Sequence, residues 1–224
     1  MPTKPKGLIV WGAGGHAKVV ADIVQLHGRH RIVAFVDDGG TADQPDKFLG
    51  IQLLSEREKL APLLKRGCRE MVIAIGNCAT RLRLAAEAQQ IGFDLCEPLV
   101  HPKATVARSA TLGRGTVVAA GAVVNPAAIL GENVIINTCA SVDHDCILEN
   151  GVHVCPGAHL AGNVTVCRGT WIGIGATVIE KIRIGKGVMI GAGAVVVSNV
   201  PDGVLALGCP ARVVADAQMP AVCV

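Results

Sequence analysis

A six-residue period runs through the second half of the chain and constrains its fold more than any other feature. Steps of six from Val106 meet sixteen aliphatic residues in succession, ending at Val196. A second series, four positions after each of these, runs from Ala110 to Val200 and holds only small or β-branched residues. Six residues match neither a helical turn nor the alternation of a single strand. The period predicts a solenoid in which three short strands and three corners form each triangular coil, with the aliphatic residues inside.

The same period predicts which residues lie next to each other in successive coils. With eighteen residues to a coil, we expect His144 to stack over Gly162, and His153 over Trp171. A glycine follows the inward aliphatic residue at several corners, where we expect a positive φ: Gly113, Gly131, Gly173, Gly185 and Gly191. The frame is unbroken, so no long loop is expected between coils.

Composition excludes several other classes of protein. Half of the residues are hydrophobic but only 2% are aromatic, so the core must consist of aliphatic side chains. A net charge of +3 without a basic run argues against a nucleic-acid partner. The nine cysteines are odd in number and form no C-x-x-C pair, which predicts reduced thiols and a cytoplasmic protein. No apolar run is long enough to span a membrane, and no metal site is predicted.

Residues 1–100 show a different pattern, in which short apolar strands alternate with amphipathic helices. We expect strands at residues 7–11, 31–36 and 71–75, and helices from the glycine-rich turn to Leu26 and from Thr80 to Gln90. Between the second and third strands we expect a loop at 39–50 and a short helix at 55–64, broken by Pro62. The alternation predicts a small Rossmann-like parallel α/β sheet. Histidines 27 and 30 are expected on a solvated turn.

Two domains are therefore expected, residues 1–100 and residues 101–224. The second includes a mostly apolar tail at 213–224 to which the sequence assigns no role. The junction carries Glu97-Pro98 and His101-Pro102, and a residue before proline favours an extended conformation.

A glycine-rich turn follows the first strand and is typical of phosphate binding. Gly12, Gly14 and Ala17 satisfy the dinucleotide fingerprint in its G/A form, with the acidic Asp37 twenty residues further on. The second mononucleotide half of a dinucleotide fold is missing, so a nucleotide diphosphate is the simpler ligand. The glycines let backbone amides approach a pyrophosphate at a helix N-terminus. A tight turn without a ligand remains the alternative.

Other residues near this turn complete the predicted substrate site. Asp37 can accept hydrogen bonds from a ribose or a base, and it ends the second strand together with Asp38. The other candidates are Gly15 and His16 in the turn, and Gly76 and Asn77 at the end of the third strand.

Three histidines in the repeats are candidates for proton transfer: His144, His153 and His159. Transfer of a group to an amine or hydroxyl needs a base, and the ordinary pKa of histidine, about 6.5, suits this role at neutral pH. His144 is flanked by Asp143 and Asp145, which can orient the ring or stabilise its imidazolium form. A solvated surface histidine is the alternative interpretation.

These motifs together resemble the bacterial nucleotide-sugar N-acetyltransferases of the hexapeptide-repeat acyltransferase superfamily. The similarity rests on the turn Gly12 to His16, the segment 137–145, residues 153 and 161–164, and the ending Gly208-Cys-Pro-Ala-Arg212. Members include the UDP-4-amino-sugar and GDP-perosamine N-acetyltransferases and the related sialic acid O-acetyltransferases. The resemblance implies a left-handed parallel β-helix, a homotrimer and acetyl-CoA as co-substrate.

The resemblance also implies roles for individual residues. His144 matches the family's general base and Asp145 its acidic partner, which is often a glutamate. His153 matches a histidine near the acetyl group, and Asn137 lies in the same region. Gly162 and Ile174 match positions that line the coenzyme A groove between adjacent subunits, and His16 matches a nucleotide-binding residue. No family role is transferred to His159.

The function expected from these residues is N-acetylation of a nucleotide-linked amino sugar, foremost a UDP-4-amino-4,6-dideoxy sugar. The amine would attack acetyl-CoA directly, because none of the cysteines lies in a recognisable Cys/His arrangement. Acetylation of GDP-perosamine and O-acetylation of a sialic acid are alternatives with the same fold. A nucleotide-binding trimeric scaffold without catalytic activity is the alternative from another class.

Overall fold

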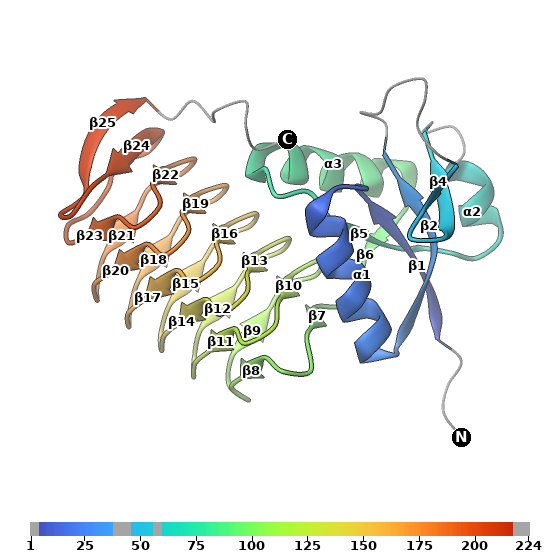
Figure 1. The fold of residues 1–224 in the computed structure, drawn as a ribbon, viewed down its shortest axis with the longest axis horizontal. Coiled ribbons are helices and arrows are strands. Elements are labelled where there is room, and N and C mark those ends of the chain that lie inside the picture. The colour runs from blue at the N-terminus through green and yellow to red at the C-terminus, as the bar shows by residue number, and fades with distance from the viewer. Residues whose placement is uncertain (1–4, 38–45, 56–59, 217–224) are drawn as a thin grey trace.

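A computed structural model of the protein describes residues 5–37, 46–55 and 60–216. An α/β unit lies beside one end of a long solenoid of short strands (Figure 1). The solenoid is a left-handed parallel β-helix: the six-residue period predicts the triangular coils, and the family resemblance implies their left-handed winding.

The α/β unit contains a six-stranded sheet in the order β3-β4-β2-β1-β5-β6. All neighbours are parallel except β3 and β4, which form an antiparallel pair. The strands are β1 Lys6–Trp11, β2 His30–Val36, β3 Lys47–Phe48, β4 Ile51–Leu54, β5 Glu70–Ile73 and β6 Asp94–Leu95. The three predicted strands are the central ones. The edge strands β3 and β6 were missed because each is too short to show a period of its own, and β4 next to β3 was missed as well.

Three helices complete this unit: α1 Gly15–His27, α2 Ala61–Lys65 and α3 Cys78–Ile91. Helix α1 buries Ala17, Val20, Ile23 and Val24, which recur at helical spacing on one face. Pro62 lies in the first turn of α2, where a missing N–H is tolerated, so the expectation that it breaks a helix was wrong.

The β-helix has three faces, and each is a parallel sheet with one strand from every coil. The first face contains β7 Leu99–Val100, β10 Val117–Val118, β13 Ile135–Ile136, β16 His153–Val154, β19 Trp171–Ile172, β22 Met189–Ile190 and β24 Val204–Leu207. The second contains β8 Thr105–Val106, β11 Val123–Val124, β14 Ser141–Val142, β17 His159–Leu160, β20 Thr177–Val178 and β23 Val195–Val196. The third contains β9 Thr111–Leu112, β12 Ile129–Leu130, β15 Ile147–Leu148, β18 Thr165–Val166 and β21 Arg183–Ile184. Strand β25, Arg212–Asp216, pairs antiparallel with β24 at the far end.

The two periodic series of the sequence form one continuous core inside the β-helix. The second residue of each strand points inward, and the small or β-branched residue four positions later fills the corner. Two buried threonines occupy corner positions, and each donates to a carbonyl at the same corner of the next coil: Thr116 Oγ1 to Gly131 at 2.9 Å and Thr170 Oγ1 to Gly185 at 2.6 Å. Their hydroxyls are therefore satisfied despite burial.

The corner glycines are required for a different reason from the one expected. Gly113 and Gly173, each directly after an inward aliphatic residue, do not have positive φ. A Cβ on Gly173 would lie 2.5 Å from the carbonyl oxygen of Ile190 in the next coil. Positive φ occurs two residues later, at Gly115 and Gly175. The predicted glycines thus serve close approach between coils rather than a left-handed backbone.

The first face of the β-helix packs against the α/β unit. Leu99 and Val117 belong to the same apolar cluster as the buried residues of α1. In contrast to the expected solvated turn, His30 is buried, and its Nε2 lies 2.6 Å from Glu70 Oε2. In the part of the chain that the structure describes, no helix is both long and apolar enough to cross a membrane.

Candidate active site

His144 lies on an edge of the β-helix, in the turn between β14 on the second face and β15 on the third. Its Nδ1 lies 2.7 Å from Asp145 Oδ2, and both side chains are more than half exposed. The hydrogen bond with Asp145 is the largest cause that raises the pKa of His144, and the charge of Asp143 acts in the same direction. With Nδ1–H donated to the carboxylate, Nε2 of the neutral ring carries the lone pair.

Backbone geometry positions this pair of side chains. Asp145 has a φ of 59°, in the left-handed region, so its carboxylate turns back toward the preceding residue. The amide of His144 donates to Asp143 Oδ1 at 2.7 Å. The aspartate at 145 therefore reaches the ring, although the family often has the longer glutamate.

Gly162 leaves room for the His144 ring. A Cβ on Gly162 would lie 2.6 Å from Cε1 and 2.7 Å from Nε2 of His144, which is closer than any real contact. The φ of Gly162 is not in the left-handed region, so the need for glycine comes from the ring alone. The stacking that the eighteen-residue coil predicts is confirmed.

His153 lies on the first face, in the junction with the α/β unit, and pairs with Trp171 of the next coil as expected. It is 7% exposed. Its Nδ1 lies 3.1 Å from the carbonyl oxygen of Gly76, and its Nε2 lies 3.1 Å from Asn137 Nδ2. Burial lowers the pKa of His153 to about 3, and the nearby Arg81 and His16 add to the effect. This ring is neutral at physiological pH.

The glycine-rich turn lies on the other side of His153. The rings of His16 and His153 are 6.4 Å apart between centroids. Nε2 of His16 is buried and has no hydrogen-bond partner among the described residues. Burial, followed by the charge of Arg81, lowers the pKa of His16 to about 4. A neutral ring with an unsatisfied nitrogen at this place can receive a polar group of a ligand.

The turn itself is open at the start of α1. Gly12 has a φ of 123° and a Cβ there would lie 2.8 Å from the carbonyl oxygen of Ala74, whereas a Cβ on Gly14 or Gly15 would meet nothing within 4 Å. No side chain caps the helix at Gly14, and no acidic residue lies in its first turn. Asp37 Oδ2 accepts from the amide of Ala13 at 3.1 Å. Such a helix N-terminus favours an anion.

Gly76 and Asn77 both accept hydrogen bonds from other residues of the protein. The Gly76 carbonyl accepts from His153 and from Arg81, and Asn77 Oδ1 caps α3 by accepting from the amide of Thr80 at 2.9 Å. Asp38 and residues 217–224 of the tail lie outside the described residues.

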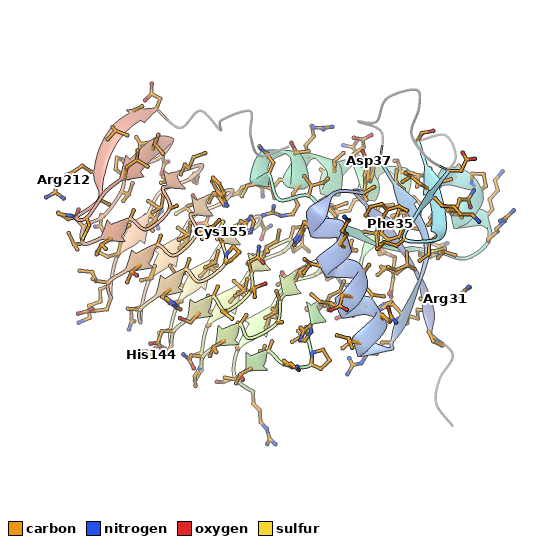
Figure 2. All side chains as sticks on the ribbon, in the orientation of Figure 1. Arg31, Phe35, Asp37, His144, Cys155 and Arg212 are labelled. Atoms are coloured by element: carbon orange, nitrogen blue, oxygen red, sulfur yellow. The ribbon has the colours of Figure 1, made fainter. Side chains whose placement is uncertain are left out.

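The candidate residues fall into two groups within one chain. His144, Asp145 and Gly162 lie on the edge between the second and third faces, whereas Asn137 and Ile174 lie on the edge between the first and second faces. Ile174 is 58% exposed. Figure 2 shows His144 at the outer edge of the β-helix and Asp37 in the α/β sheet, well separated from it. Neither in these two groups nor elsewhere in the described ranges do three or more potential metal ligands gather.

Arg81 is the residue that the sequence-based prediction missed. It is 1% exposed and bridges α3 to the β-helix. A signal was present in the sequence, because Arg81 shares helical spacing with the buried Leu84, Ala85 and Ala88 and so falls on the buried face of α3.

Comparison with known proteins places this geometry in context. Residues 7–88 match the sequence family described as the PglD N-terminal domain. UDP-N-acetylbacillosamine N-acetyltransferase of Bacillus subtilis is 37% identical over 118 residues, which cover 51% of this chain and 52% of that protein. The match thus spans about half the length of this curated relative.

Two solved structures are similar over nearly their whole length. The first is a mutant of perosamine N-acetyltransferase from Caulobacter crescentus, with one histidine replaced by asparagine, in complex with CoA and GDP-perosamine. It is 38% identical with a TM-score of 0.88, covering 94% of this chain and 97% of that one. The second is the acetyltransferase domain of PglB from Neisseria gonorrhoeae in complex with acetyl coenzyme A, 40% identical with a TM-score of 0.84, covering 94% and 100%.

Proposed function

The chain belongs to the nucleotide-sugar N-acetyltransferases of the hexapeptide-repeat superfamily, and we propose that it transfers the acetyl group of acetyl-CoA to the amine of a nucleotide-linked amino sugar. The observation that carries this proposal is the His144–Asp145 pair, held at 2.7 Å over the bare backbone of Gly162. The relative from Bacillus subtilis, a UDP-N-acetylbacillosamine N-acetyltransferase, supports a UDP-linked amino sugar as the acceptor, for which the sequence predicts a UDP-4-amino-4,6-dideoxy sugar. The GDP-perosamine complex supports a GDP-linked sugar as the alternative.

The reaction proceeds by direct attack. The lone pair of the neutral amine attacks the thioester carbonyl carbon, so that a C–N bond forms and the C–S bond breaks. His144 takes the amine proton at Nε2 as the tetrahedral intermediate forms, and the proton then passes to the departing thiolate of coenzyme A. Asp145 stabilises the imidazolium form of His144 in between.

The buried thiols of Cys78, Cys96 and Cys146 fit an acyl-enzyme intermediate poorly. Burial is the largest cause that raises the pKa of Cys78 and Cys146, and it raises that of Cys96 to about 12. A nucleophilic cysteine needs a lowered pKa instead. This supports direct transfer without a covalent intermediate.

The acceptor and the donor are held by different parts of the chain. We assign the nucleotide diphosphate to Gly12, Gly14 and Gly15 at the open start of α1, with His16 and Asp37 beside its sugar or base and Gly76 and Asn77 close by. Asp38, which was predicted with them, lies outside the described residues. We assign acetyl-CoA to the β-helix edges that carry Gly162 and Ile174, with His153 and Asn137 near the acetyl group. In this proposal residues 1–100 form the acceptor domain and residues 101–224 the acyltransferase domain, although β7 at the end of the first region already belongs to the β-helix.

A trimer would unite the two groups of residues. His144 and Ile174 lie on separate edges of one prism, so one chain alone does not surround the reacting atoms. A closed three-fold arrangement would bring the edge with His144 of one subunit against the edge with Ile174 of the next. Sedimentation at micromolar concentration should give three times the chain mass of 23.1 kDa. An active monomer would contradict this arrangement. The cytoplasmic location stays a prediction.

Thiol release from acetyl-CoA tests the proposed function. The protein is mixed with acetyl-CoA and, in turn, with UDP-, GDP- and dTDP-linked 4-amino sugars and with a free sialic acid. We expect thiol release with at least one nucleotide amino sugar, and little with the His144→Ala variant under the same conditions. Release with sialic acid alone would favour O-acetylation, and no release with any acceptor would favour the scaffold.

A further inference from the structure

Arg81 is a buried cation at the junction between the α/β unit and the β-helix. All five N–H groups of its guanidinium have acceptors. They donate to five backbone carbonyls: Nε to Asn133 at 2.9 Å, Nη1 to Ile75 and Gly76 at 2.8 Å each, and Nη2 to Gly151 at 2.8 Å and Val152 at 3.4 Å. Nη2 also lies 3.6 Å from the Cys78 sulfur.

The acceptors of Arg81 come from three separate segments of the chain. One is the turn between β5 and α3, and the other two are the same corner of the β-helix in two successive coils. None of these acceptors is a carboxylate, so the guanidinium is buried without a counter-ion among its hydrogen-bond partners. Burial of a charge is costly even when its hydrogen bonds are made. Such a residue calls for a role beyond filling space, which an apolar side chain would do at lower cost.

The carbonyl of Gly76 connects Arg81 to His153. This oxygen accepts from Arg81 Nη1 at 2.8 Å and lies 3.1 Å from His153 Nδ1. Arginine has no acceptor and a carbonyl has no donor, so the hydrogen between Gly76 and His153 must be on Nδ1. The lone pair of the neutral ring is then on Nε2, where Asn137 Nδ2 donates at 3.1 Å.

We propose that Arg81 is a positioning residue for acetyl transfer, which fixes the Gly76 carbonyl and thereby holds His153 in the Nδ1–H tautomer with its Nε2 lone pair directed at Asn137. The catalytic consequence rests on the proposed function, whereas the tautomer itself does not. In this state His153 accepts a hydrogen bond at Nε2 and cannot donate one there. It therefore complements His144, whose Nε2 is exposed to take up a proton.

Burial and the nearby cations keep the His153 ring neutral, and they outweigh the hydrogen bond with Gly76, which acts in the opposite direction. Arg81 of α3 and His16 of α1 lie near the ring, Cys78 of α3 contacts the His153 backbone, and Trp171 pairs with His153 from β19. Arg81 and any protonated His16 oppose a positive charge on His153, and there is no carboxylate among the causes that shift its pKa. The lone pair on Nε2 is thus preserved over the pH range in which the amine of an acceptor loses its proton.

The test measures the tautomer directly. The full-length protein is labelled with ¹⁵N-histidine, and two-bond ¹H–¹⁵N correlation spectra are recorded from pH 8 to pH 5, with His153 assigned from the His153→Gln variant. In the wild-type protein we expect a protonated Nδ1 and an unprotonated Nε2 at every pH. A proton on Nε2, or titration of His153 near pH 6.5, would overturn the proposal without any variant of Arg81.

The Arg81→Lys variant tests the cause. Lysine keeps the charge, but its three donors radiate from one nitrogen and cannot reach carbonyls in three segments. We expect mixed tautomers of His153 and a kcat lowered by about 10²-fold, the effect of misplacing an active-site group by about 1 Å. The KM for both substrates should change much less. Arg81→Gln, which removes the buried charge, is the second variant if Arg81→Lys does not fold.

Leu82→Ala is the matched control. Leu82 is the next residue of α3 and packs over Gly151 at the same junction, but none of its atoms lies within 4 Å of a Cβ placed on Gly76. It should lower thermal stability while the His153 spectrum and kcat stay those of the wild type. An unchanged spectrum in Arg81→Lys, or an equal change in Leu82→Ala, would overturn the proposal. Because the spectra need no sugar, a shifted tautomer in a protein that acetylates nothing would support the positioning and refute the proposed function.

Discussion

The free energy of unfolding should fall steeply between pH 7 and pH 5, because two histidines stay neutral in the folded protein. Burial is the largest cause for both, and it lowers the pKa of His153 to about 3 and that of His16 to about 4, from an ordinary value of 6.5. Above pH 6.5 both rings are neutral in the folded and the unfolded chain, so neither affects stability there. As the pH falls below 6.5, the unfolded chain binds protons that the folded protein does not, and unfolding becomes more favourable.

The magnitude follows from the two pKa values. Each histidine costs about 1.4 kcal/mol per pH unit, from pH 6.5 down to its pKa in the folded protein. At pH 5 the loss is about 2 kcal/mol for each ring and about 4 kcal/mol for the pair, a large part of the stability of an ordinary domain. The pKa of His27 is lowered as well, mainly by burial, and it acts in the same direction.

Urea unfolding followed by circular dichroism at pH 7, 6 and 5 measures this loss. His153→Gln should remove about half of the acid-dependent loss, because glutamine does not titrate. His144→Gln is the control: this ring is exposed, and its pKa is raised by the hydrogen bond with Asp145, so its removal should not reduce the loss. Equal free energies of unfolding at pH 7 and pH 5, or the full loss in His153→Gln, would refute the reasoning.

Three further predictions concern the candidate site. Gly162→Ala should lower kcat by about 10²-fold with little change in stability, because the new Cβ must displace the exposed His144 ring from its position. A variant with the steady-state rates of the wild type would show that catalysis does not depend on this position of the ring. His144→Ala should lower kcat by about 10²- to 10⁴-fold, and Asp145→Asn should lower it by less. In the wild type, kcat should fall with decreasing pH through a pKa above 6.5, because a protonated base cannot accept the amine proton. A His144→Ala enzyme with normal kcat at all pH values would remove this residue from the mechanism. Gly14→Val should raise the KM for the nucleotide sugar and leave the KM for acetyl-CoA and the sedimentation unchanged. The valine side chain meets open space in the fold but blocks approach of the ligand to the amides of α1. Unchanged acceptor kinetics would mean that the glycine-rich segment is only a turn.

Much of the β-helix was predictable because its constraints are periodic. An inward aliphatic residue every six positions determines the coil, and the coil length determines the vertical neighbours, so the stacking of His144 over Gly162 and of His153 over Trp171 follows from counting. The reason for the corner glycines was not predictable in this way. Whether a position needs positive φ or merely lacks space depends on the backbone of the next coil, as at Gly173.

In the α/β unit, the sequence by itself determined the central strands and two main helices, since each carries a hydrophobic pattern long enough to recognise. The edge strands came only with the structure, because two-residue strands such as β3 and β6 depend on a partner for their hydrogen bonds. The burial of His30 likewise depends on Glu70, which lies forty residues away in the chain.

The chemical state of the candidate site was decided by tertiary structure. The sequence placed His144 between two aspartates, and this local arrangement is sufficient to raise its pKa. His153 instead owes its low pKa to burial, to which Arg81 and His16 on two different helices add. Its ring contacts the carbonyl oxygen of Gly76, which is 77 positions away in the chain. Burial and hydrogen bonds between segments distant in sequence set these properties, and no local pattern encodes such contacts. The pKa values of two histidines nine residues apart in one β-helix are therefore shifted in opposite directions, because the α/β unit covers only one of them.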